Sequence, residues 1–535
     1  MRIEELRQAV KTAAQKLFQI EIEPEISRPD EKFGDYATNA ALQLAKETAG
    51  DLRQIAQQLA AELRNIPGLE EVGVAGPGFL NFRLTDEALT RAADASVELS
   101  KPLEGQEILV EFGDANPFKE MHIGHLYSLI VGDAIASLLS ARGARVRRLG
   151  YHGDVGRHVA MAIWGMQRHE GPIGQCYAAG AKAFAEDERA KTEIQAINEH
   201  IYKQDDPKIN ELYEKGRAQS LSEFDKIYET LGLKYDRDYF ESESTPVGIK
   251  FVEEHRDVFK ESDGALVYEG EKVGLHTRVF ITSKGLPTYE TKDLGLAELK
   301  NRDFPEAARS IIITANEQSE YFKVMLAALA EIDPALAKKT THLAHGFLSL
   351  TSGKMSSRSG NVYTAADLLD SIKAAVEELY PDSRIKNDVY LSAVKYTFLK
   401  HRLGQDVVID PKESASLEGN SGPYLQYAHA RACSILAKTE DRPSEAQTEL
   451  DENERRLARK IGEYPEIIAK ATAELMPHHI CTYLYELAQV FNSFYETSRI
   501  IGDEREALRL KLVKTYSQVL KSGLNILNVT APERM

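Results

Sequence analysis

The chain has 535 residues, of which 43% are hydrophobic and 28% are charged, and its formal net charge is −17. This length is too great for one hydrophobic core and predicts roughly three or four domains, while the ordinary globular composition excludes a low-complexity or repeat protein. The negative charge argues against a protein that coats nucleic acid by bulk attraction, so any RNA contact needs local clusters of Lys and Arg.

The start of the chain and the cysteines bear on the compartment. Residues 1–17 predict an amphipathic helix with acidic residues in its first turn, unlike a signal peptide. We find no apolar run near the roughly 18 residues that a membrane span needs. The three cysteines are too widely separated for a disulfide framework or a zinc site: Cys176, Cys433 and Cys481. We therefore expect a cytoplasmic protein without membrane contact.

The first 100 residues predict a small α/β domain. Amphipathic helical stretches surround a turn-rich segment at 28–36. Gly76-Pro-Gly78 marks a turn, and the alternating residues that follow it, 79–83, predict a strand. A helix and a linker near 102–105 close this part.

Residues 101–400 predict an α/β domain with a parallel sheet. Short apolar runs alternate with helical patterns near 124–141 and 318–331, and such alternation places a ligand site at the carboxyl ends of the strands. The stretch from about 170 to 250 is charged and helical, so we interpret it as an insertion. The candidate strands are Ile108–Phe112, Arg145–Leu149, Arg278–Thr282, Ser310–Thr314 and His342–Leu350.

Residues 401–535 lack strand signals and predict an all-α bundle. Two stretches carry apolar residues at spacings of three and four, which is the helical pattern. These residues are Ile480, Tyr483, Leu484, Leu487, Phe491 and Phe494 in one stretch, and Leu508, Leu512, Tyr516, Val519, Leu520 and Leu527 in the other.

The first chemical motif follows the first strand of the parallel sheet. It runs from Glu111 to His122-Ile-Gly-His125, where a helix begins. A glycine at a helix N-terminus admits a phosphate close to the backbone, and two imidazoles can donate to charge that develops there. Taken alone, the two histidines are equally well read as ordinary core or surface residues.

The second motif is the loop Gly353-Lys-Met-Ser-Ser-Arg-Ser-Gly-Asn361. Its glycines, serines and two cations suit a mobile clamp on the β- and γ-phosphates of a nucleotide. A solvated serine-rich connection has the same composition, and this alternative stays open for the loop alone.

Together the two motifs resemble one enzyme family. His122-Ile-Gly-His125 matches the HIGH signature of class I aminoacyl-tRNA synthetases, and Lys354-Met-Ser-Ser-Arg358 is similar to their KMSKS loop. The resemblance implies a Rossmann-type catalytic domain within 101–400. It implies catalytic roles for His122, His125 and Lys354. The ATP contacts that it implies are His122, Gly124, His125, Gly346, Lys354, Met355, Ser356 and Ser357.

Further stretches resemble the arginyl-tRNA synthetases over nearly the whole chain, least in 170–250. They are Gly34–Asn39, Tyr289-Glu-Thr-Lys-Asp293, Asn316–Gln318, Gly422–Arg431 and Pro532–Met535. The resemblance implies that the N-terminal domain contacts the outer corner of tRNA, with Asn39 as a candidate, and that 401–535 binds the anticodon. The implied arginine contacts are Glu111, Asn116, His125, Tyr289, Asp293 and Gln318.

The chemistry of Tyr289 and Asp293 agrees with this assignment. Four residues apart at a helix start, the two side chains can face one pocket, where a carboxylate pairs with a guanidinium and a phenol orients it. Glu111 and Asn116 would then bind the α-amino group. The alternatives are a helix-capping role for Asp293 and simple packing for Tyr289.

One residue departs from the family pattern. Ser357 occupies the place of the second lysine of KMSKS. Lys119, three residues before His122, has counterparts in the family and can supply the missing charge as a further catalytic residue. Its alternative is a solvated surface lysine.

The sequence therefore predicts an enzyme that uses ATP and Mg²⁺ to activate L-arginine and then transfers it to tRNA(Arg), and we expect a monomer without a metal site of its own. Two other functions stay open: a small nucleotidylyltransferase with an HxGH loop, and a catalytically silent tRNA-binding relative. Aromatic and amide groups of the bundle are candidates for anticodon bases, although most aromatics in such helices are core residues. They are Tyr483, Phe491, Asn492 and Tyr495.

Overall fold

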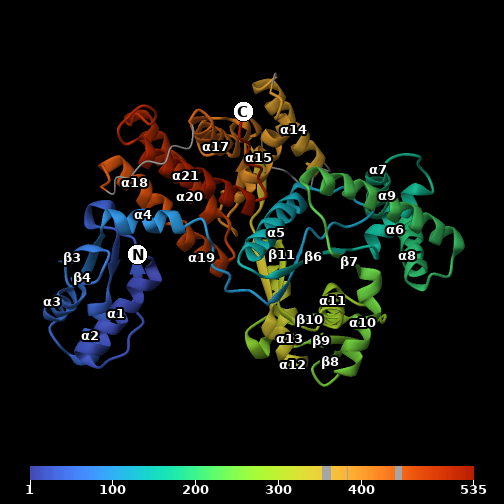
Figure 1. Cartoon of the computed structure of the whole chain (residues 1–535). Coiled ribbons are helices and arrows are strands. Elements are labelled where there is room, and N and C mark those ends of the chain that lie inside the picture. Colours follow the sequence, from blue (N-terminus) through green and yellow to red (C-terminus); the bar gives the residue numbers. More distant parts are fainter. Residues whose placement is uncertain (352–362, 382, 440–448) are drawn as a thin grey trace.

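A computed structural model describes residues 1–351, 363–381, 383–439 and 449–535. The N-terminal part is a four-stranded antiparallel sheet in the order β1-β2-β4-β3, packed with helices through a shared apolar core (Figure 1). Its elements are α1 (Ile3–Phe18), β1 (Ile26–Ser27), η1 (Glu31–Phe33), β2 (Tyr36–Thr38), α2 (Ala40–Thr48), α3 (Leu52–Leu63), β3 (Leu69–Ala75), β4 (Phe79–Leu84) and α4 (Asp86–Ala95).

The centre of the molecule is a five-stranded parallel sheet in the order β12-β11-β5-β6-β7. β5 lies in the middle, so the loop that follows it opens at the carboxyl edge between two neighbouring strands, where α/β proteins bind ligands. The strands are β5 (Glu107–Phe112), β6 (Arg145–His152), β7 (Arg237–Phe240), β11 (Ala307–Ala315) and β12 (Thr340–His345).

Three strand predictions need correction. The segment predicted as 278–282 forms β10 (Arg278–Ile281), which pairs antiparallel with β9 (Ala265–Tyr268) in a separate sheet completed by β8 (Lys260–Ser262). The segment predicted as 342–350 divides into β12 and β13 (Leu348–Leu350), and β13 pairs with β14 (Val407–Ile409). β14 is also a strand beyond residue 400, where none was expected.

Helix α5 (Ile123–Ala141) follows β5 and lies in the core against the sheet. By length and composition it is the one helix of the described ranges that could cross a membrane, and 78% of its apolar window is buried inside the protein. It is therefore a longer apolar run than the sequence analysis recognised. The other helices around the sheets are α6 (Arg157–Met166), α10 (Glu241–Glu254), η2 (Gly270–Val273), α11 (Tyr289–Asp303), η3 (Asn316–Gln318), α12 (Ser319–Ile332) and α13 (Pro334–Lys339).

The predicted insertion is helical in its first part only. α7 (Ile173–Glu186), α8 (Glu188–Lys203) and α9 (Pro207–Leu231) form a unit with its own small core, on the side of the molecule opposite to the N-terminal sheet (Figure 1). The later part of the stretch 170–250 contains β7 and α10, which belong to the central α/β unit. The charged composition of that part concealed a strand that is only four residues long.

The C-terminal part is helical, as expected. Both predicted apolar stripes are buried, the first in α20 and the second in α21. The helices are α14 (Ala365–Leu379), α15 (Lys386–Leu399), α16 (Pro411–Ala415), α17 (Gly422–Leu436), α18 (Glu452–Ile461), α19 (Tyr464–Glu474), α20 (His478–Thr497) and α21 (Glu506–Ile526).

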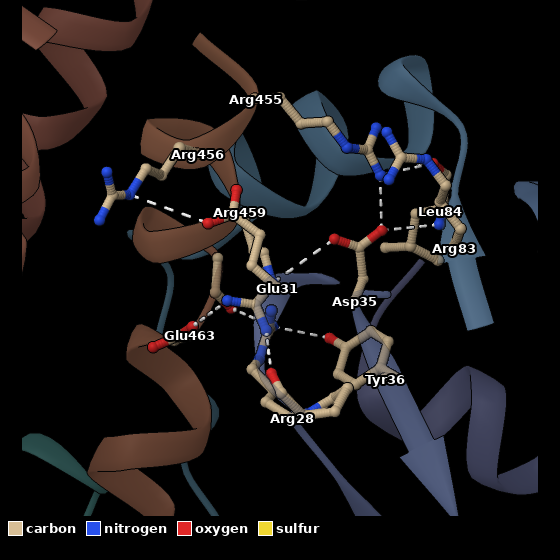
Figure 2. Close-up of polar contacts among 12 residues, drawn as sticks. Arg28, Glu31, Asp35, Tyr36, Arg83, Leu84, Arg455, Arg456, Arg459 and Glu463 are labelled. Atoms are coloured by element: carbon tan, nitrogen blue, oxygen red, sulfur yellow. Dashed lines mark hydrogen bonds and ion pairs between the residues drawn. The ribbon is translucent and has the colours of Figure 1, made fainter. Parts of the chain in front are cut away.

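A buried polar interface joins the N-terminal sheet to α18 and α19 (Figure 2). Arg455 donates to Asp35 at 2.6 Å and to Asp86 at 2.5 Å. Arg28 reaches Glu466 with two hydrogen bonds of 2.8 Å. Because these bonds connect residues more than 360 positions apart, they fix the two ends of the chain against each other.

Candidate active site

A pocket of about 390 Å³ opens at the carboxyl edge of the parallel sheet. Its walls come from the end of β5 and the following loop, from β6, and from the first turns of α10 and α11. The residues that line it are Glu111, Asp114, Asn116, Tyr151, Gly153, Glu241, Arg278, Tyr289, Glu290, Asp293, Glu317, Gln318, Tyr321 and Phe322. Six of these carry carboxyl groups and one is a cation, so the pocket suits a positively charged ligand.

Close packing of α10 against α11 places carboxylates from both helices in this wall. A Cβ on Gly248 would lie 1.9 Å from the carbonyl oxygen of Thr291, so only glycine allows this approach. Thr291 Oγ1 also donates to the carbonyl of Phe280 at 2.6 Å, which anchors the first turn of α11 to β10. Asp293 lies in the next positions of the same helix and is 9% exposed.

Two of the pocket carboxylates are matched by buried lysines. Lys300 Nζ lies 2.5 Å from Glu111, with each side chain 3% exposed. Lys292 Nζ lies 2.5 Å from Glu241 in an equally buried pair. In both pairs the protein itself balances the negative charge, because a buried carboxylate without a partner is costly.

Asp293 has no such partner among the described residues. Burial, together with the negative charges of Glu111 and Glu241, raises the pKa of its carboxyl well above the usual value. A ligand cation would relieve this repulsion. Tyr289 lies one helical turn earlier, at the mouth, and is 65% exposed. Tyr151 lies deeper and shares a hydrogen bond of 2.9 Å with Ser244.

The other predicted arginine contacts divide into two groups. Asn116 and Gln318 line the pocket, together with Glu111, Tyr289 and Asp293. His125 is not among the lining residues and lies instead in the first turn of α5. Every pocket residue of the prediction thus faces one cavity, whereas His125 belongs to the neighbouring helix start.

The two signature histidines cap α5. The backbone N–H of Gly124 donates to His122 Nδ1 at 3.1 Å, and the N–H of His122 donates to His125 Nδ1 at 3.2 Å. Each neutral ring must then carry its proton on Nε2, because Nδ1 is used as an acceptor. The rings stack with centroids 3.7 Å apart. Two N–H donors are thereby oriented at a helix N-terminus, which attracts anions.

Both imidazoles are held neutral. Desolvation, followed by the nearby charge of Lys119, lowers the pKa of His122 to about 4. Desolvation and the neighbouring His122 lower the pKa of His125 well below its usual value. At neutral pH the pair therefore offers hydrogen-bond donors rather than fixed positive charges.

The second motif lies outside the described residues. This applies to Lys354, Met355, Ser356 and Ser357. Its C-terminal flank is described: Thr364 forms an isolated antiparallel bridge with His122, and the N–H of Ala365 donates to the carbonyl of Met121 at 2.8 Å. The chain therefore returns to the start of α5 directly after the motif. Gly346, another predicted ATP contact, follows β12 and packs on the backbone of Gln405.

Helices of the insertion position Lys119. Its ammonium group lies 5.0 Å from the ring centroid of Tyr177 on α7. The preceding residue, Phe118, stacks on Tyr213 of α9, and its N–H donates to Ser220 at 2.8 Å. Desolvation lowers the pKa of Lys119, while the charge of Glu241 raises it. Lys119 is thus a held side chain rather than a free surface lysine.

The predicted RNA contacts lie in different environments. Tyr483 and Phe491 are 1% and 0% exposed in the bundle core, where neither ring can stack on a base, so the structure corrects these two. Tyr495 is 43% exposed, and Arg431 lies 5.3 Å from the centroid of its ring. Asn492 accepts a hydrogen bond from Arg431 at 2.8 Å. In the N-terminal domain, Asn39 Oδ1 is buried without a hydrogen-bond partner.

Several pocket residues escaped the sequence analysis. Asp114 lies inside the first motif, where only the flanking residues were considered. Glu241 lay hidden in the presumed insertion. Tyr151 and Arg278 are single residues at strand ends, and no local pattern distinguishes them. The useful signal would have been polar residues that follow each strand of a predicted parallel sheet.

Comparison with known protein families covers nearly all of the chain. Residues 4–84 match the arginyl tRNA synthetase N terminal domain. Residues 88–410 match the catalytic domain of tRNA synthetases class I (R). Residues 425–535 match the DALR anticodon binding domain.

Individual proteins are similar over the same length. The chain is 33% identical over 566 residues to an arginine--tRNA ligase of Limosilactobacillus fermentum, covering 99% of this chain and 100% of that protein. It is 29% identical to an arginine--tRNA ligase of Flavobacterium psychrophilum, over 88% of each. The solved arginyl-tRNA synthetase of Thermus thermophilus superposes over 100% of both chains with a TM-score of 0.82 and 27% identity. The chain therefore belongs to the arginyl-tRNA synthetase family.

Proposed function

We propose that the protein is an arginine–tRNA ligase, which activates L-arginine with ATP to arginyl-adenylate and transfers the arginyl group to tRNA(Arg). The observation that carries this proposal is an acidic pocket with the unpaired Asp293 at the carboxyl edge of the parallel sheet, beside a histidine-capped helix start. The cation-binding pocket suits arginine, and the helix start suits the phosphates of ATP.

Arginine binds with its guanidinium group at Asp293 and Tyr289. A carboxylate can accept two parallel hydrogen bonds from the guanidinium fork, and the phenol of Tyr289 closes the mouth. Asn116 and Gln318 bind the other end of the substrate. The carboxylate of arginine is left to attack the α-phosphate of ATP, and pyrophosphate leaves.

The ATP phosphates bind at the start of α5. The Nε2–H groups of His122 and His125 donate to the oxygens of the α-phosphate, where negative charge develops as the new bond forms. Lys119 faces the same region from the insertion side, and Lys354 acts from the second motif. Mg²⁺ enters with the phosphates, since it usually binds through substrate phosphates rather than protein cages, and it neutralises their charge.

The tRNA binds across both ends of the chain. An exposed platform on the bundle combines Tyr427, 40% exposed, with Tyr495, and the guanidinium of Arg431 lies between the two rings. Exposed aromatics with an arginine can stack on unpaired anticodon bases. Asn39 is the candidate contact in the N-terminal domain. We also propose a cytoplasmic monomer, in line with the reduced state of the three cysteines.

The decisive experiment is arginine-dependent exchange of pyrophosphate into ATP, with and without tRNA. Because the family needs bound tRNA before it activates arginine, we expect exchange with tRNA(Arg) and little without it. Vigorous exchange from protein, ATP and arginine alone would contradict this tRNA dependence. No exchange even with tRNA would favour the silent RNA-binding alternative, which no described feature supports.

A further inference from the structure

The charges of the arginine pocket do not balance within the protein. Three of its carboxylates are paired: Glu111 with Lys300, Glu241 with Lys292, and Glu290 with Arg278 at 3.0 Å. In the described parts of the chain the other three have no ion pair: Asp114, Asp293 and Glu317. Glu317 is exposed to water, so Asp114 and Asp293 are the unpaired carboxylates of the interior.

Asp114 is held there by a constrained turn at the end of β5. Its φ is 38°, and the preceding Gly113 has a φ of 95°. A non-glycine residue in this left-handed region is strained by on the order of 1–3 kcal/mol, and such strain gathers at functional sites. Two bonds support the turn: the N–H of Gly113 donates to Ser128 Oγ at 2.9 Å, and the hydroxyl of Tyr235 donates to the carbonyl of Phe112 at 2.7 Å.

The carboxyl group of Asp114 is incompletely satisfied. Its Oδ1 atom is buried and has no hydrogen-bond partner. An unsatisfied buried acceptor costs about 1–3 kcal/mol. Burial and the charges of Glu111 and Asp293 also raise the pKa of the Asp114 carboxyl well above its usual value. Both observations describe a group that lacks a positively charged partner in the empty pocket.

The chemistry of arginine supplies two positive groups, a guanidinium at one end and an α-ammonium at the other. Asp293 serves the first of them. We propose that Asp114 binds the α-ammonium group of the substrate, so that the pocket recognises arginine by both of its charges. This inference rests on the proposed function. It also revises the role expected for Glu111, whose charge is already matched by Lys300 at 2.5 Å and which therefore has little attraction left for the ammonium.

The test combines a ligand truncation with a residue substitution. The ligands are L-arginine and 5-guanidinopentanoate, which lacks the α-amino group, and binding to the full chain with tRNA is measured by calorimetry. Asp114→Asn removes the charge and keeps a residue that tolerates positive φ. Asp263→Asn is the matched control, because Asp263 also has a positive φ, of 49°, but lies in an exposed turn away from the pocket.

We expect Asp114→Asn to weaken arginine binding by roughly 30-fold or more, the range for truncating one partner of a buried charge pair. The analogue should lose less than about 3-fold in affinity, because it never contacts this carboxylate. The control should change neither value. Asp114→Gly, which also removes the strain of the turn, should repeat the result and separates loss of charge from loss of fold.

Equal losses for both ligands, or no loss for arginine in a folded variant, would overturn the role of Asp114 and leave the proposed function intact. Failure of the wild-type protein to bind arginine with tRNA present would instead overturn the proposed function, and this inference with it. Asp293→Asn separates the two sites further, since it should weaken both ligands alike.

Discussion

At the scale of residues, the sequence indicated which side chains meet but not how their charges are distributed. The four-residue spacing predicted that Tyr289 and Asp293 share a pocket, and both line it. The pairing of Glu111 with Lys300 joins residues 189 positions apart, and no local pattern encodes such a contact. The unpaired state of Asp293 follows only from that arrangement. Substrate specificity therefore depends on tertiary contacts that a motif does not contain.

Asp293 should decide the preference for a charged side chain. Asp293→Asn is expected to reduce kcat/KM for arginine by about 2–5 kcal/mol, the range for truncating one partner of a buried charge pair. Citrulline, which has a neutral group in place of the guanidinium, should lose much less because it gains little from the carboxylate. Aminoacylation rates for both amino acids measure this. An equal loss for the two would make Asp293 a structural residue.

At the scale of elements, long periodic helices and buried strands were predictable, whereas short edge elements were not. The apolar stripes of α20 and α21 are strong signals, and both lie in the core. β7 is only four residues long and at a sheet edge, so its sequence contains no clear alternation. The apolar run 278–281 was recognised, but its antiparallel partner could not be. Pairing between strands is a tertiary property, and the hydrophobic pattern alone does not specify it.

The insertion should act on catalysis through Lys119. Its ammonium group is held over the Tyr177 ring and can supply the charge that Ser357 lacks. Lys119→Ala is expected to slow adenylate formation by on the order of 10²-fold, as lost transition-state donors commonly do. Ser357→Lys in that background should recover part of the rate.

Pyrophosphate exchange in the presence of tRNA measures both variants. Lys182→Ala, a change at an exposed lysine on the same helix as Tyr177, is the control and should leave the rate unchanged. If Lys119→Ala also turns over at the wild-type rate, the lysine is not part of the machinery.

At the scale of the whole molecule, the N-terminal sheet and the C-terminal bundle form one structural unit although they are the ends of the sequence. Asp35 is 2% exposed, and it accepts hydrogen bonds from Arg455 and from the N–H of Leu84 at 2.8 Å. Tyr36 donates to Glu466 at 2.9 Å on the same interface (Figure 2). We expect such an interface to keep the two proposed tRNA-binding surfaces at a fixed separation.

Arg455 should therefore matter both for stability and for tRNA, but not for the arginine pocket. Arg455→Met leaves Asp35 buried and unpaired, which should cost about 3–5 kcal/mol in the free energy of unfolding. The neighbouring Arg456 is the matched control, because it is exposed and lies 3.8 Å from an exposed Glu31 (Figure 2). Arg456→Met should cost less than about 1 kcal/mol. Adding Asp35→Asn to Arg455→Met should restore part of the stability, since it removes the unpaired charge.

The functional consequence is measured at a temperature where Arg455→Met is still folded. The KM for tRNA should rise, because the two surfaces are no longer held together, while the KM for arginine at saturating tRNA should stay near the wild-type value. A parallel rise in both KM values would point to general loosening of the fold. Unchanged KM for tRNA in a destabilised variant would show that the interface stabilises the protein without setting the geometry of tRNA binding.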